Sequence, residues 1–125
     1  MSPRFDDEDT TARVLVEELL DARARGSLDA VAELLAPGVR YWDCVRGDVH
    51  GRREAAAALL EVAGADGLRR TPAATVAHGA RAVVELRTTA FGDERPLTEV
   101  YAFDAGGVAA CRAYFDPGAD PSFRG

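Results

Sequence analysis

Beyond residue 72 the chain reads AATVAHGARAVVELRTTAFGDERPLTEVYAFDAGGVAACRAYF (73–115). Runs rich in β-branched and aromatic residues alternate in this segment with short turn sequences. The runs are 73–77, 82–91, 97–103 and 108–115, and the turn sequences between them are His78-Gly79, Gly92-Asp93 and Asp104-Ala105-Gly106-Gly107. Because short turns join neighbouring antiparallel strands, the pattern predicts a meander of antiparallel hairpins.

The residues before this segment predict three helices. Apolar side chains recur at three- and four-residue steps over 11–25, with charges between them, which is helical periodicity. Ser27 suits the N-cap of a second helix, and Pro37-Gly38 is expected to end it. Four consecutive alanines and two leucines within 52–62 favour a third helix.

One strand is predicted between the second and third helices. Residues 39–45 alternate, placing Val39, Tyr41, Asp43 and Val45 on one face and Arg40, Trp42 and Cys44 on the other. Arg46-Gly47-Asp48 then reads as a turn. Helices first, followed by a long antiparallel sheet without alternation of strands and helices, are typical of the α+β class.

Composition places the chain among ordinary globular proteins. Its 125 residues fit one domain, 1–125, with loose tails at 1–10 and 117–125, and 47% of residues are hydrophobic against 29% charged. The net charge of −6 argues against nucleic-acid and membrane partners. Without a run of about 20 apolar residues or a signal-peptide pattern, the protein is expected to be cytoplasmic.

The two cysteines, Cys44 and Cys111, each lie within an apolar run far apart in the sequence. Both are therefore expected to be small buried side chains and not a disulfide. The two histidines are widely separated and no cysteine or carboxylate clusters stand near them, so neither a metal site nor a cofactor is expected.

Several short strings resemble the nuclear transport factor 2-like superfamily, which includes the SnoaL-like polyketide cyclases and the ketosteroid isomerases. The strings are RGSLDA (25–30), LAPGV (35–39) running into YWD (41–43), HGR (50–52) and CRAYFD (111–116), and the resemblance covers about 14–116. It implies a strongly curved, mostly antiparallel sheet, a cone-like cystatin-like roll, wrapped by three helices around an apolar pocket. Dimerisation through the outer side of the sheet is common in this superfamily, and Trp42 would suit such a contact.

The same resemblance supplies candidate catalytic residues. Asp43 matches the general base of the isomerases, and Glu99 falls where they place a protonated acid that donates to the oxyanion. Leu19 stands where they have a tyrosine on the first helix, and Tyr41, which shares a strand face with Asp43, is a possible substitute. Asp116 resembles the carboxylate of the cyclases.

These residues suit acid/base chemistry on an apolar carbonyl compound by a cofactor-free isomerase, cyclase or lyase. Apolar surroundings raise the pKa of a carboxyl group, and Asp43 among Val39, Tyr41 and Val45 is expected to show this. Two carboxyl groups with separated pKa values provide one base and one acid, as in the ketosteroid isomerases themselves. The predicted ligand wall consists of Leu19, Val45, His50, Tyr101, Phe103, Cys111 and Phe115.

Other interpretations of these residues stay open. The fold also serves non-catalytic binding of a small molecule or partner chain. The related limonene epoxide hydrolases use an arginine between two aspartates, and Glu85-Leu86-Arg87 offers an acid and a base on one face in a different order. Asp43 would be purely structural if it capped the turn at Arg46-Gly47 or paired with an arginine. Glu99 would be purely structural if it faced solvent opposite Arg87 or Arg95.

Overall fold

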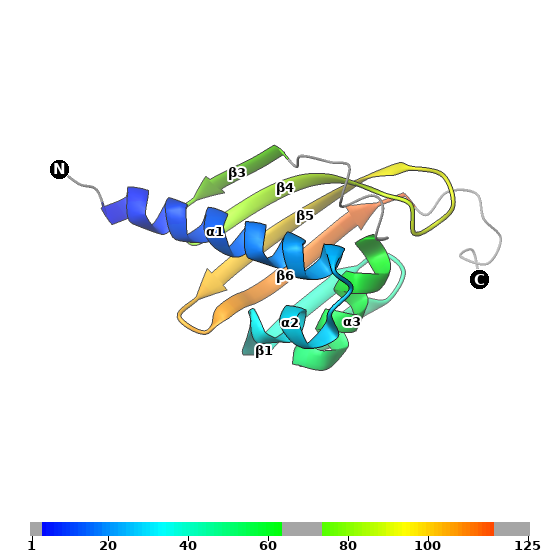
Figure 1. Ribbon diagram of the computed structural model, residues 1–125, viewed down its shortest axis with the longest axis horizontal. Coiled ribbons are helices and arrows are strands. Elements are labelled where there is room, and N and C mark those ends of the chain that lie inside the picture. The colour runs from blue at the N-terminus through cyan, green and yellow to red at the C-terminus, as the bar shows by residue number, and fades with distance from the viewer. Residues whose placement is uncertain (1–3, 64–73, 117–125) are drawn as a thin grey trace.

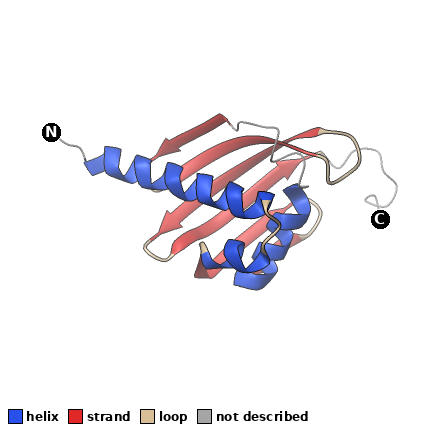
Figure 2. Cartoon of the chain, viewed as in Figure 1, coloured by secondary structure: helices blue, strands red, loops and turns tan. Residues whose placement is uncertain are grey.

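A computed structural model of the chain describes residues 4–63 and 74–116. Its helices are α1 (Arg4–Ala24), α2 (Leu28–Glu33) and α3 (Arg52–Ala63). Its strands are β1 (Leu35–Asp43), β2 (Gly47–His50), β3 (Ala74–His78), β4 (Arg81–Thr88), β5 (Arg95–Asp104) and β6 (Gly107–Phe115). The helices cover one face of a single curved sheet, as Figures 1 and 2 show. The predicted α+β class is confirmed.

The six strands lie in the order β2-β1-β6-β5-β4-β3. The predicted hairpins are confirmed, since β3 to β6 pair antiparallel with their neighbours in sequence. Among the described strands, the one parallel pair joins β1 to β6. On the covered face α1 contacts β3 and β4, while α3 contacts β1 (Figure 1). The sheet thus brings its first and last strands in the sequence, β1 and β6, into direct contact.

The helix boundaries correct two predictions. Residues 4–10, expected to be a loose tail, are the first turns of α1. Pro37-Gly38 does not end α2, which stops at Glu33, but lies within β1, where the register to β6 shifts between Leu35 and Arg40. Proline has no N–H for a ladder bond, so a break in register is its usual place in a strand. The predicted tail at 117–125 lies outside the described residues.

Ser27 caps α2 as predicted, because its Oγ accepts from the backbone N–H of Ala30 at 3.1 Å. The predicted turn at 46–48 is only partly right. Gly47–His50 forms the short strand β2, whose four residues pair with β1 from Arg40 to Asp43. A strand this short leaves too little alternation to be recognised in the sequence.

The core lies between the helices and the concave side of the sheet. Leu19 of α1, Leu59 of α3 and Leu97 of β5 are among its fully buried side chains. The alternation predicted for β1 is confirmed up to Asp43, because Val39 and Tyr41 are buried while Arg40 is exposed on the opposite face. We call this opposite side, which α1, α2 and α3 leave uncovered (Figure 1), the outer face of the sheet.

Candidate functional site

The last three residues of β1 place Tyr41 and Asp43 together on the concave side of the sheet. They share a face because they are two residues apart in a strand. The phenol oxygen of Tyr41 donates to Oδ2 of Asp43 at 2.7 Å, and neither side chain is more than 1% exposed. The predicted shared face is therefore confirmed, but the phenol donates to the carboxylate of Asp43.

Three further donors reach Asp43 from the turn that follows. The backbone N–H groups of Val45 and Arg46 donate to Oδ1 at 2.9 and 2.6 Å. Nη1 of Arg46 donates to Oδ2 at 2.6 Å, and its Nη2 reaches Glu61 of α3 at 2.9 Å. A carboxylate has about four acceptor positions. Those of Asp43 are all used within the chain.

The prediction that the pKa of Asp43 is raised is wrong. Burial acts in that direction, but the hydrogen bonds from Arg46 and Tyr41 and from the backbone of Val45 outweigh it and lower the pKa below its usual value. Val45 is 41% exposed and provides no apolar cover. The contacts of the structural interpretation of Asp43, a turn cap and a pair with an arginine, are both present.

Tyr41 is held as a neutral phenol. Burial raises its pKa, and the hydrogen bond to Asp43 raises it further, because an ionised phenol beside a carboxylate is unfavourable. Tyr41 is therefore a donor, and its proton is directed to Asp43 and not toward a ligand.

Glu99 belongs to a second cluster, at the centre of the core. Its carboxylate receives Nη1 and Nη2 of Arg23 at 2.5 and 2.7 Å, one to each oxygen, and the phenol of Tyr101 also donates to Oε1. Arg23 in turn donates through Nε and Nη2 to the carbonyl oxygen of Leu59. The side chains of Arg23 and Glu99 are both fully buried. The alternative that placed Glu99 in solvent is wrong.

This geometry fixes Arg23 as a cation. Burial alone would lower the pKa of Arg23, but the negative charge of Glu99 and the paired hydrogen bonds more than offset it, so the pKa is raised. For the neighbouring Tyr101 and Cys111, which are neutral when protonated, burial raises the pKa. The interior of the sheet therefore contains a complete ion pair and not a free acid.

The other predicted site residues are scattered. Leu19, Tyr101 and Cys111 are buried in the core, and Phe103 and Phe115 are half-buried beside it. His50 and Asp116 are exposed, and His50 lies on the outer face opposite Arg40. The structure does not place these residues and Asp43 together around one pocket.

Two alternatives from the sequence are also corrected. Glu85 and Arg87 of β4 are exposed on the outer face, far from an interior site for epoxide opening. Cys44, expected to be buried, is exposed, while Cys111 is buried, and both are free thiols. Residues 4–63 and 74–116 contain no group of three residues suited to hold a metal ion.

Arg23 and Arg46 are the partners of the two interior carboxylates, and the sequence analysis did not identify them. Arg23 follows Leu19 by four residues and Val16 by seven, so it falls on the buried side of α1. A charge on an apolar helix stripe signals a buried partner, and this spacing is the clue that was available. Arg46 was named only as part of the turn after residue 45, and the arginine that would pair with Asp43 was not specified.

A hollow of about 360 Å³ lies at the other end of the concave side. We call it the α1 hollow. Its walls are Thr11, Ala12 and Leu15 of α1, Gly79 and Ala80 of the β3–β4 turn, and Phe103, Asp104 and Ala105 at the end of β5. Among the predicted ligand residues it includes Phe103, and its lining is mainly apolar.

The sequence matches the model of the SnoaL-like domain over residues 16–111. The chain belongs to the SnoaL-like domain family. No curated protein matches the sequence. Within the described residues of this SnoaL-like chain, no helix is long and apolar enough to cross a membrane.

Solved structures similar to this SnoaL-like chain share its fold and have different names. A candidate ketosteroid isomerase from Kribbella flavida is 17% identical, with 91% of this chain and 84% of that chain covered and a TM-score of 0.69. An epoxide hydrolase from M. tuberculosis that resembles limonene epoxide hydrolases is 22% identical. The match covers 87% of this chain and 85% of that chain, with a TM-score of 0.65.

A de novo designed protein with a curved β-sheet is as similar as these natural proteins. It is 18% identical, with 90% of this chain and 91% of that chain covered and a TM-score of 0.70. At such identities the comparisons show a shared fold, and chemistry must be argued from the side chains.

Proposed function

We propose that this SnoaL-like domain binds an apolar small molecule without transforming it. The observation that carries the proposal is the hydrogen bonding of its two interior carboxylates. Both oxygens of Asp43 accept two donors each, and both oxygens of Glu99 are paired with Arg23. A general base needs a free lone pair within reach of the proton it removes, and a general acid needs a proton to give.

The α1 hollow is the proposed ligand site. Its volume falls within the range of about 300–1,000 Å³ that is usual for small-molecule pockets. The ring of Phe103 stacks on Tyr101 at 6.1 Å between centroids, so it is held on the side that faces the core. Leu15 and Ala12 complete an apolar wall on α1. A compact ligand with a mainly apolar body fits this lining.

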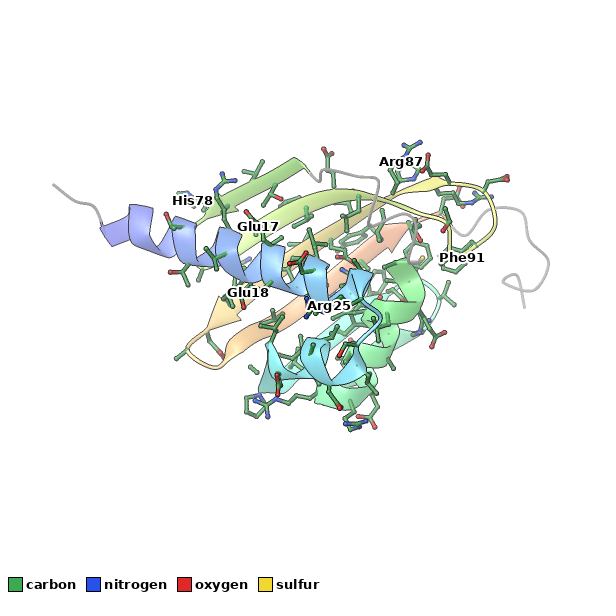
Figure 3. The ribbon with its side chains drawn as sticks, in the orientation of Figure 1. Glu17, Glu18, Arg25, His78, Arg87 and Phe91 are labelled. Atoms are coloured by element: carbon green, nitrogen blue, oxygen red, sulfur yellow. The ribbon has the colours of Figure 1, made fainter. Side chains whose placement is uncertain are left out.

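A thermal-shift screen of steroid-like, polyketide-like and epoxide compounds tests the proposal, with turnover of each hit followed chemically. Phe103→Ala should abolish the stabilisation by a hit. Phe91→Ala is the matched control, because Phe91 stacks on Phe115 at 4.8 Å and lies at the opposite end of the sheet from His78 and the β3–β4 turn (Figure 3). We expect this control variant to respond to ligand like the wild type.

Asp43→Asn separates binding from catalysis. Under the proposal this variant binds hits as the wild type does, and neither protein turns them over. Turnover of a carbonyl or epoxide compound by the wild type, lost in a folded Asp43→Asn variant, would instead establish the acid/base enzyme first inferred from the sequence.

The homodimer through the outer face stays a prediction of the family resemblance, as does the cytoplasmic location. Sedimentation of the full chain at several concentrations measures the first directly.

A further inference from the structure

The outer face contains a second hollow, of about 230 Å³, at the pairing of β1 with β6. Its side-chain walls are Arg40, Trp42, Asp48 and Arg112, and Ala110 lies beneath them. In the register of the sheet, Arg40 is opposite Ala110 and Trp42 is opposite Arg112. Arg40, Trp42 and Arg112 have long side chains, whereas Ala110 among them has only a methyl group. The missing volume at Ala110 creates the hollow, which we call the β1–β6 hollow.

Arg112 is fixed in place before any ligand arrives. Its guanidinium carbon lies 4.4 Å from the centroid of the Trp42 ring, a cation–π contact, and its Nε donates to the phenol oxygen of Tyr114 at 2.7 Å. Tyr114 also packs on Trp42 with 5.5 Å between ring centroids. These contacts use one N–H and one face of the guanidinium, so its Nη donors stay available. A pre-positioned donor loses less entropy on binding.

Arg40 supplies a second positive charge to the same hollow. Among the residues that the structure describes, its guanidinium has neither a hydrogen-bond nor an ion-pair partner, and the same holds for the carboxylate of Asp48. The hollow thus has two guanidinium groups against one carboxylate, in a chain whose net charge is −6. Local positive charge on an acidic protein favours an anion at this position.

We propose that the β1–β6 hollow binds a small organic carboxylate with a flat apolar body. Arg40 and Arg112 bind the carboxylate, since guanidinium groups match its geometry with paired donors. The edge of Trp42 and the methyl of Ala110 contact the apolar part. An inorganic anion leaves these apolar groups without a partner, and Asp48 on the rim disfavours ions of higher charge.

Benzoate is a suitable probe, because it combines a carboxylate with a flat ring. Trp42 is the only tryptophan of the chain, so its fluorescence reports on this hollow directly. We expect benzoate to change this fluorescence saturably, whereas its neutral isostere benzamide does not at the same concentration. Inorganic phosphate should bind at least tenfold more weakly than benzoate. Equal responses to benzoate and benzamide, or to benzoate and phosphate, would overturn the proposed ligand class.

Arg40→Gln tests the site itself. This side chain is exposed and pairs with no described residue, so the variant should fold normally and bind benzoate at least tenfold more weakly. Arg81→Gln is the matched control. Arg81 is exposed in the same cross-strand row of the outer face, beyond Ala110 and Ala102. Its variant should bind benzoate like the wild type, and an equal loss in both variants would refute the site.

Two further measurements separate this proposal from the others. Phe103→Ala should leave the benzoate response unchanged, because Phe103 lines the α1 hollow and not this one. The sedimenting mass is recorded in the same samples. A dimer in which Trp42 responds to none of the probes would mean that a second copy covers the outer face, and the proposal would then be wrong.

Discussion

The guanidinium of Arg46 lies 2.6 Å from Oδ2 of Asp43, where an approaching substrate would have to deliver a proton. The same guanidinium reaches Glu61 and so joins the β1–β2 turn to α3. An arginine that is only 24% exposed keeps most of its attraction for the buried carboxylate, whereas exposed pairs contribute little. The Asp43–Arg46 pair therefore organises a turn, and this role is opposed to general-base catalysis.

The stability of the protein should depend on the ionisation of Asp43. Because folding lowers its pKa, its contribution is complete above the unfolded-chain value of about 3.8 and is lost as pH falls below that value. Asp43→Asn should reduce the free energy of unfolding by about 2 kcal/mol at pH 7, since strong hydrogen bonds are weakened. Urea unfolding from pH 7 to pH 3 measures this, and a difference between the two proteins that stays constant with pH would contradict it.

Breaking the buried Arg23–Glu99 pair should be costly. Glu99→Gln leaves a buried guanidinium without its counter-charge, which typically destabilises by about 3–5 kcal/mol. The double replacement Arg23→Met with Glu99→Leu removes both charges and should recover much of this loss. Chemical denaturation of Arg23→Met, Glu99→Leu and the double variant gives the coupling energy. Additive effects would show that the pair is not coupled.

Gly107 is required where β6 begins. Its φ of 117° is one that other residues rarely adopt, and a Cβ there would collide with the carbonyl oxygen of Leu34. Gly107→Ala should therefore lower stability by at least about 1–3 kcal/mol. Gly79→Ala, also at positive φ but with open space around the added Cβ, is the control and should lose less. The midpoints of thermal unfolding compare the two variants.

The two thiols should differ in reactivity. Cys44 is exposed, while Cys111 is buried with a raised pKa, and the thiolate is the reactive form. Iodoacetamide should label Cys44 in the native protein and both residues only after unfolding, as mass spectrometry of the peptides would show. Labelling of Cys111 at the same rate as Cys44 would contradict the packing described for β6.

The sequence by itself determined the elements other than β2, and the faces of the strands. Period-two alternation between glycine turns identifies the strands of the meander, and Ser27 marks the start of α2, because these signals act within a few residues. Tyr41 and Asp43 were placed on one face for the same reason. Local spacing also offered the pairing of Asp43 with a nearby arginine as one alternative, without deciding it.

Only the tertiary structure decided what these residues do. Arg23 and Glu99 are 76 positions apart and meet because α1 packs across the sheet, which no local pattern encodes. The pKa of Asp43 depends on whether burial or its hydrogen bonds prevail, and that balance requires the positions of four donors. Alternation predicts which way a side chain points, but the partners it finds there depend on how the helices and the sheet pack.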